Sequence, residues 1–133
     1  MRLLTVGGGS GGHVTPVLAI INELSRLDDR LEVEFVCDAA FESQARGLMA
    51  HAAVPVRVHK IAAGKLRRYH NETWFDRLRD IRTNWHNLVD LFKIGIGFIQ
   101  SLWIILRFRP DVIFAKGGYV SLPLGVAAWL CGK

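Results

Sequence analysis

Five of the six residues from Gly7 to Gly12 are glycine, and a segment of this kind can fold in very few ways. It follows a short apolar run at residues 3–6 and precedes an amphipathic run with helical spacing. Glycine has no Cβ and reaches positive φ, so backbone N–H groups in such a turn can approach an anion closely. The positive end of the following helix points at the same place. The segment therefore predicts a phosphate or diphosphate cradle, with a tight turn that binds no ligand as the alternative.

Strands and helices alternate along most of the chain, starting with a helix that we expect to be capped by Thr15 and to begin near Pro16. This alternation predicts a single α/β domain, a Rossmann-like parallel sheet with helices on both faces. We expect strands at residues 2–6, 33–37, 54–60 and 111–115, and helices at 16–28, 40–52, from about 72, at 86–107 and at 122–131.

A second glycine turn, Gly117-Gly118, follows the strand expected at 111–115. In the strand order 3-2-1-4, the first and fourth strands are neighbours at the topological switch point, so both glycine turns would meet at one crevice. Two anion cradles side by side suit a diphosphate. His13 would lie in this crevice as a ligand contact or general base, with a purely structural role as the alternative.

The chain is basic, with a net charge of +5 and a pI near 9.7, which favours acidic partners such as nucleic acid, anionic lipid or phosphorylated substrates. Between residues 57 and 82 there are eight basic and three acidic residues, interleaved with aromatic ones. A basic rim around apolar surface is typical of proteins that lie on an anionic membrane. Core aromatics beside a solvated charged face are the alternative. The candidate membrane-facing residues are Lys65, Arg67, Arg68, Trp74 and Phe75.

The helix expected at 86–107 carries two adjacent apolar stripes, which is more than one face of a sheet requires. Its most apolar run, residues 94–106, is shorter than the ~20 residues of a membrane span. We therefore expect a helix buried on the sheet, with surplus apolar surface near the basic loop.

Other chemistries receive little support from the sequence. Cys37 and Cys131 lie far apart and are expected to be buried free thiols. The remaining histidines lack metal-ligand spacing, so no metal or other cofactor is expected. The N-terminal apolar run is too short for a signal peptide, which favours a cytoplasmic protein. Nothing resembles a nucleic-acid reading helix or a stacking sheet.

A dinucleotide-binding oxidoreductase domain is a rival interpretation. The first glycine segment formally matches the G-x-G-x-x-G fingerprint, and Asp38 ends the second strand where a ribose-binding acid could sit. The match is awkward, because His13, Thr15 and Pro16 occupy the turn in which the fingerprint's helix is usually under way. A nicotinamide cofactor also leaves the second glycine turn unexplained.

Three motifs together resemble the N-terminal domain of the MurG glycosyltransferases, which are family 28 enzymes of the GT-B fold. They are the segment from Gly7 to Pro16, Arg109-Pro110-Asp111-Val112, and Gly117-Gly118-Tyr119-Val120-Ser121-x-Pro123. The resemblance implies transfer of GlcNAc from UDP-GlcNAc, with inversion, to the C4 hydroxyl of an undecaprenyl-diphosphate-linked muramoyl-pentapeptide in peptidoglycan synthesis. It also implies a place on the inner face of the cell membrane. In this family the N-terminal half meets the acceptor, and a C-terminal domain, absent from this chain, binds the donor.

The resemblance also implies roles for individual residues. His13 is the candidate base, Thr15 and Tyr119 line the cleft, and Ser10 stands where the family commonly has threonine. The diphosphate-binding segment would comprise Gly9, Ser10, Gly11, Gly12, Gly117 and Gly118. A membrane-recruiting, non-catalytic subunit of a split glycosyltransferase is a further alternative.

Overall fold

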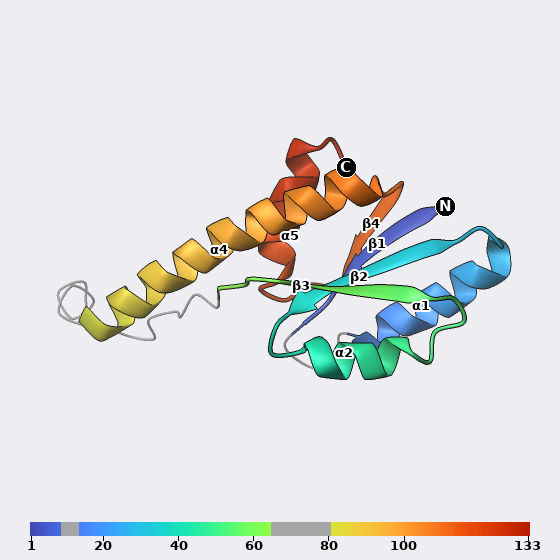
Figure 1. The fold of residues 1–133 in the computed structure, drawn as a ribbon, viewed down its shortest axis with the longest axis horizontal. Helices are drawn as coiled ribbons and strands as arrows, with labels where there is room; N and C mark the ends of the chain where they lie inside the picture. The colour runs from blue at the N-terminus through green and yellow to red at the C-terminus, as the bar shows by residue number, and fades with distance from the viewer. Residues whose placement is uncertain (9–13, 65–80) are drawn as a thin grey trace.

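The computed structural model describes residues 1–8, 14–64 and 81–133, which form the predicted α/β fold (Figure 1). Its four strands make one parallel sheet in the order β3-β2-β1-β4, which confirms the predicted order. The helix expected from about residue 72 falls partly outside the described residues. The elements are β1 (Arg2–Val6), α1 (Val14–Leu27), β2 (Glu32–Asp38), α2 (Glu42–Met49), β3 (Val56–Ile61), α4 (Ile81–Phe108), β4 (Val112–Ala115) and α5 (Ser121–Leu130).

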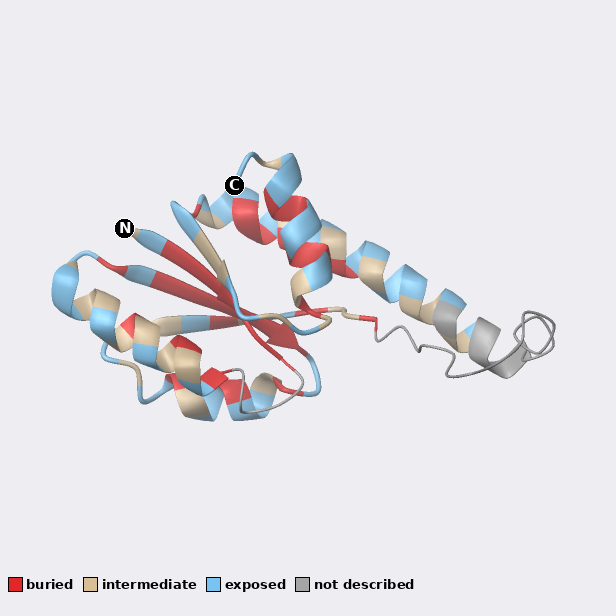
Figure 2. Cartoon of the chain, turned by 180° about the vertical axis from the view of Figure 1, so that it is seen from behind, coloured by how far each residue is buried: buried red, intermediate tan, exposed pale blue. Residues whose placement is uncertain are grey.

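Two apolar cores form because side chains alternate between the two faces of the sheet. Helices α1 and α2 cover one face, where Phe35 is fully buried, and α4 and α5 pack on the other, where Leu4 is fully buried. Figure 2 shows the buried residues concentrated along the strands between these two layers. Strand β1 is central and buried on both faces, and its carboxyl end lies deep in the molecule.

The two cysteines are free thiols, as predicted, but only one is fully buried. Cys37 lies in the core beneath α2, and burial raises the pKa of its thiol to about 12. A thiol with so high a pKa is almost entirely protonated near neutral pH and is therefore unreactive. Cys131, at the end of α5, is half-buried.

Helix α1 begins earlier than its sequence predicts. It starts at Val14, so Thr15 lies inside the first turn and is not the cap, and Pro16 is the third helical residue. Val14 is fully buried in the core with Phe35, and this burial stabilises a helix that already starts at Val14. Proline is tolerated at this place because the first-turn N–H groups of a helix have no intrahelical partner.

Helix α4 departs most from expectation. It is one continuous helix of 28 residues, and the stretch Leu88–Phe108 is long and apolar enough to cross a membrane by length and composition alone. The expectation of a run too short for a span is therefore wrong. Only 22% of that window is buried, so the expectation of a helix buried on the sheet holds for its C-terminal part alone. Figure 1 shows the N-terminal half of α4 extending away from the sheet.

The backbone of α4 lies directly against the chain that leaves β3. A Cβ at Gly97 would collide with the carbonyl oxygen of Ala62, and one at Gly64 would collide with that of Asp90. The side-chain oxygen of Gln100 accepts a hydrogen bond of 2.7 Å from the Ala62 N–H. Gly97 thus permits close packing of α4 on this segment and does not break the helix.

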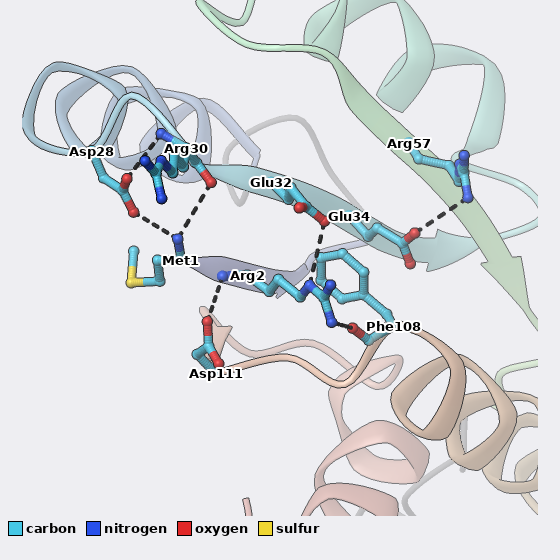
Figure 3. A network of polar contacts seen from close by, with 9 residues as sticks. All are labelled: Met1, Arg2, Asp28, Arg30, Glu32, Glu34, Arg57, Phe108 and Asp111. Carbon is cyan, nitrogen blue, oxygen red and sulfur yellow. Dashed lines mark hydrogen bonds and ion pairs between the residues drawn. The ribbon is translucent and has the colours of Figure 1, made fainter.

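The amino ends of the strands are tied together by polar contacts on the opposite side of the sheet from the glycine turns (Figure 3). The Met1 ammonium group donates to Asp28 Oδ2 at 2.7 Å, and the Arg2 N–H donates to Asp111 Oδ2 at 2.7 Å. The Arg2 guanidinium also pairs with Glu32 at 3.4 Å. These contacts fix the amino end of β1 against its neighbours.

Candidate functional site

The two glycine turns meet at the carboxyl edge of the sheet. Strands β1 and β4 are paired, with Val6 opposite Ala115, so the segments that follow them emerge side by side. A Cβ at Gly118 would lie 3.4 Å from the carbonyl oxygen of Gly8. The predicted convergence of the two turns is confirmed for the residues that the structure describes.

The second turn has a conformation that requires glycine. Gly117 and Gly118 have φ of 107° and 93°, which side-chain-bearing residues rarely adopt. The Ser121 hydroxyl donates to the Gly117 carbonyl at 2.9 Å, and the Ser121 N–H donates to that of Gly118 at 3.1 Å. These bonds connect the turn to the first residue of α5. The positive end of that helix therefore faces the crevice.

Asp38 lies at the carboxyl end of β2, beside the segments that follow β1 and β4. It is only 5% exposed, and its Oδ1 accepts a hydrogen bond of 3.0 Å from the Phe41 N–H just before α2. Its Oδ2 is fully buried. A Cβ at Gly8 would lie 2.7 Å from this oxygen and 2.8 Å from a methyl group of Val120. Gly8 therefore sits between the second strand and the second glycine turn.

Tyr119 lies beside the same carboxylate. Burial, followed by the neighbouring Asp38 carboxylate, raises the pKa of the Tyr119 hydroxyl to about 12. The hydroxyl stays protonated near neutral pH, and the Asp38 carboxylate is its side-chain partner.

The structure places part of the predicted site. Gly117, Gly118 and Tyr119 lie together in the turn after β4, next to Gly8, and Thr15 is exposed on the first turn of α1. The catalytic candidate His13 and the membrane-facing candidates lie outside the described residues, and so do four members of the first glycine turn. Those members are Gly9, Ser10, Gly11 and Gly12, and the membrane-facing candidates are Lys65, Arg67, Arg68, Trp74 and Phe75.

Asp38 and Val120 lie beside Gly8 at the candidate site, although sequence reasoning did not assign them to it. The sequence suggests a role for Asp38 only in the dinucleotide interpretation, as a ribose-binding acid. Its position after β2, at the edge where the glycine turns emerge, was the signal that could have identified it. Within residues 1–8, 14–64 and 81–133, no group of three or more histidine, cysteine or acidic side chains is arranged to hold a metal ion.

Exposed apolar side chains also gather on α4 and on α5. Phe92 and Trp103 on α4 are 68% and 55% exposed, and Trp129 on α5 is 76% exposed. The Arg107 guanidinium lies 5.1 Å from the centre of the Trp103 ring, within range of a cation–π interaction. The other exposed apolar side chains of these two helices are Trp85, Leu88, Leu91, Ile96, Ile99, Leu106, Leu122, Val126 and Leu130. We call this set of α4 and α5 residues the apolar stripe.

Comparison with known proteins decides the family. The sequence profile of the glycosyltransferase family 28 N-terminal domain matches residues 3–133. The chain belongs to this family.

A relative of the family 28 domain from Streptococcus equi subsp. equi (strain 4047) is 39% identical over 132 residues. It is named a UDP-N-acetylglucosamine--N-acetylmuramyl-(pentapeptide) pyrophosphoryl-undecaprenol N-acetylglucosamine transferase. The match covers 98% of this chain and 32% of that protein, so the chain spans about a third of the length of the curated relatives it matches.

Solved structures support the fold of the family 28 domain. Acinetobacter baumannii MurG superposes with a TM-score of 0.65 at 21% identity, over 98% of this chain and 33% of that one. The UDP-GlcNAc 2-epimerase of Methanocaldococcus jannaschii gives 0.60 at 14% identity, over 99% and 29%. These likenesses confirm a Rossmann-like domain of the GT-B type. The comparisons favour neither the oxidoreductase nor the split-subunit alternative.

Proposed function

We propose that this chain is the acceptor-binding half of an inverting, metal-independent GlcNAc transferase of peptidoglycan synthesis. The observation that carries the proposal is the meeting of two glycine turns at one crevice, at the carboxyl edge of a family 28 domain. Relatives 38–39% identical to it are named as transferases that act on a pyrophosphoryl-undecaprenol substrate. A diphosphate between a sugar and a lipid matches a crevice with two adjacent anion-binding turns.

The acceptor diphosphate would be held by backbone N–H groups of both turns. Gly11 and Gly12 would contribute from the first turn and Gly117 and Gly118 from the second, with Gly9 and Ser10 completing the loop. Thr15 and Tyr119 would line the cleft. Fixed donors of this kind bind an anion without having to reorganise, so much of the catalysis would come from orientation of the acceptor.

His13 would act as the general base. It would remove the proton from the C4 hydroxyl of the muramoyl sugar as that oxygen attacks the anomeric carbon of GlcNAc, and the bond from that carbon to UDP would break with inversion. UDP-GlcNAc would be held mainly by a separate donor-binding domain. In a full-length transferase, His13→Ala is expected to lower turnover far more than acceptor binding. Unchanged turnover would assign His13 a structural role.

We further propose that the domain works at the cytoplasmic face of the membrane without crossing it. The apolar stripe offers the apolar surface, and the net charge of +5 favours an anionic leaflet. Ser101, Ile104 and Ile105 of α4 are buried against the rest of the domain, so this helix could not enter a bilayer alone without losing those contacts. Lys65, Arg67, Arg68, Trp74 and Phe75 remain the candidates for the basic and aromatic rim.

A competition assay tests the diphosphate cradle. A fluorescent, soluble analogue of the lipid-diphosphate acceptor should bind the chain and be displaced by inorganic diphosphate. Gly118→Ala should weaken this binding, because alanine is strained at the φ of 93° found there. Gly47→Ala, in open space on α2, is the matched control and should leave binding unchanged. Binding that inorganic diphosphate does not compete with would contradict the proposal.

A further inference from the structure

One row of exposed side chains on α4 changes from apolar to charged toward the carboxyl end of the helix. Phe92, Ile96, Ile99 and Trp103 follow one another at intervals of three or four residues, and each is more than half exposed. This spacing places them on one side of the helix. Arg107 continues the row four residues after Trp103 and is exposed as well. The row therefore ends in a cation.

The Arg107 guanidinium is held by an aromatic ring. It lies over the Trp103 ring, 5.1 Å from the ring centre, so the two side chains form a cation–π contact. No ion pair joins Arg107 to an acidic side chain in the part of the chain that the structure describes. A guanidinium carries its N–H donors at its edge, and stacking through its face leaves those donors available to an anion.

Two hollows flank this end of α4, where the helix lies next to β3. The first has a volume of about 390 Å³ and lies between the row and the strand. Its lining combines apolar, aromatic and polar side chains: Ile99, Gln100, Trp103 and Ile104 from α4, and His59 and Lys60 from β3. Apolar and hydrogen-bonding groups thus meet in one hollow beside Trp103.

The second hollow, of about 650 Å³, lies at the amino ends of the strands and is lined from α4 by Arg107. Two carboxylates also line it, and each has a guanidinium partner (Figure 3). Glu32 pairs with Arg2 at 3.4 Å. Glu34 pairs with Arg57 at 3.6 Å. Among the lining side chains, Arg107 therefore carries the positive charge that no carboxylate balances.

The occupant of this surface has to match an apolar row, an aromatic ring and a cation, in that order. A phospholipid leaflet presents acyl chains, then the interface at which tryptophan side chains concentrate, and then phosphate groups. A long cationic side chain at such an interface buries its stem and reaches the phosphate layer with its charge. A free phosphate would use only the last of these features, and a nucleic acid would leave the apolar row in water. The order therefore favours a membrane lipid.

We propose that Arg107 binds the phosphate of an anionic membrane lipid, with Trp103 at the level of the interface and the acyl chains beside Phe92, Ile96 and Ile99. The inference rests on the part of the proposed function that places the domain on a membrane. It adds a defined headgroup contact, where attraction by net charge alone would favour no particular residue. It also sets an orientation, in which the half of α4 that extends away from the sheet (Figure 1) enters the leaflet.

Arg107→Gln tests the headgroup contact, because glutamine keeps part of the stem and removes the charge. Co-sedimentation with vesicles of phosphatidylglycerol and phosphatidylcholine would measure the affinity of the chain. The variant should bind about tenfold or more weakly, as expected for loss of a hydrogen-bonded charge contact. Arg26→Gln is the matched control, with the same change of charge at an exposed position on α1, across the sheet from α4. It should weaken binding by less than about twofold, since surface attraction falls off within a Debye length.

The outcomes separate the headgroup contact from the membrane placement. Equal losses for the two arginine variants would mean diffuse attraction, and would overturn the inference while leaving the domain on the membrane. If the unmodified chain does not bind these vesicles, the membrane placement fails and the inference fails with it.

A second measurement, on the unmodified chain, identifies the source of the phosphate. Dihexanoyl phosphatidylglycerol below its micelle concentration should shift the indole N–H resonance of Trp103 in nuclear magnetic resonance spectra. Inorganic phosphate at the same concentration should shift it much less. Equal shifts would mean that Arg107 takes a free anion, and an unshifted Trp103 would mean that the lipid does not reach the row. Either result would overturn the inference.

Discussion

Gly118 faces the carbonyl oxygen of Gly8, and a methyl group on Gly118 would lie 3.4 Å from that oxygen. The two residues are far apart in sequence, yet they belong to the two turns that leave the neighbouring strands β1 and β4. Gly8, at the start of the first turn, therefore lies against the second turn, so a change at either of the two glycines is expected to affect the other.

Gly8→Ala should destabilise the fold and distort the crevice. The added methyl group would lie 2.7 Å from Asp38 Oδ2 and 2.8 Å from a Val120 methyl group. Overpacking of this kind typically costs about 1–3 kcal/mol. Urea unfolding would measure the loss.

Gly125→Ala is the control for this prediction. It lies on α5 with open space around it and should instead stabilise the chain by about 0.5–1 kcal/mol through helix propensity. Equal effects of the two substitutions would contradict the described packing.

Gly97→Ala and Gly95→Ala form a matched pair two residues apart on α4. At Gly97 the methyl group would collide with the carbonyl oxygen of Ala62, whereas at Gly95 it would meet nothing within 4 Å. We expect Gly97→Ala to lower the free energy of unfolding by about 1–3 kcal/mol and Gly95→Ala to raise it by up to about 1 kcal/mol. Thermal and urea unfolding of both variants would check this. A stabilising Gly97→Ala would mean that α4 does not pack closely on the segment after β3.

Because of Tyr119, the free energy of unfolding should fall as the pH rises into the alkaline range. Its pKa is raised from the ordinary 10 to about 12 in the folded chain, by burial first and then by Asp38. The folded state therefore holds this proton more tightly than the unfolded state does, and the contribution to stability is complete below pH 10 and is lost as the pH rises toward 12. Tyr119→Phe should remove this part of the pH dependence.

The ionisation of Tyr119 can also be followed directly, by the ultraviolet absorbance of tyrosinate in a chain with Tyr69→Phe, so that one tyrosine remains. Asp38→Asn should lower the pKa of Tyr119, since the substitution removes the negative charge beside the hydroxyl. A pKa that does not change would show that burial alone is responsible.

The apolar stripe should bind anionic vesicles. Phe92→Gln removes a 68% exposed aromatic side chain from α4, and burial of such a side chain is worth about 1.5–3 kcal/mol, so vesicle affinity should fall about tenfold or more. Leu27→Gln is the control, because Leu27 is 77% exposed at the end of α1, on the opposite face of the sheet. Co-sedimentation at several salt concentrations would measure both variants. An equal loss for Leu27→Gln would show that the binding is not specific to the stripe.

The sequence predicts the sheet and the junction of the turns well, because their signals are local. Glycine-rich turns after apolar runs identify the strand ends. The alternation of strands and helices indicates a parallel α/β sheet, and the doubly wound form of that sheet has the order found here, β3-β2-β1-β4. The convergence of Gly8 and Gly118 follows from that order alone.

Helix α4 could not be predicted to the same degree, because apolar periodicity shows that a face is hydrophobic and not what covers it. Ile99 and Ile105 look alike in the sequence, yet Ile99 is exposed and Ile105 is buried. The start of α1 was misjudged for a similar reason, since burial of Val14 overrides the capping signal of Thr15. The contact between Tyr119 and Asp38 depends on atomic positions that no sequence pattern reports.

The central claim is that the crevice between the glycine turns binds the acceptor. Calorimetric titration of the chain with a soluble lipid-diphosphate acceptor analogue, with UDP-GlcNAc and with NAD, each separately, tests it most directly. We predict saturable binding of the acceptor analogue and no binding of either nucleotide. Binding of NAD alone would mean that the first glycine turn is a dinucleotide site, and would contradict the claim.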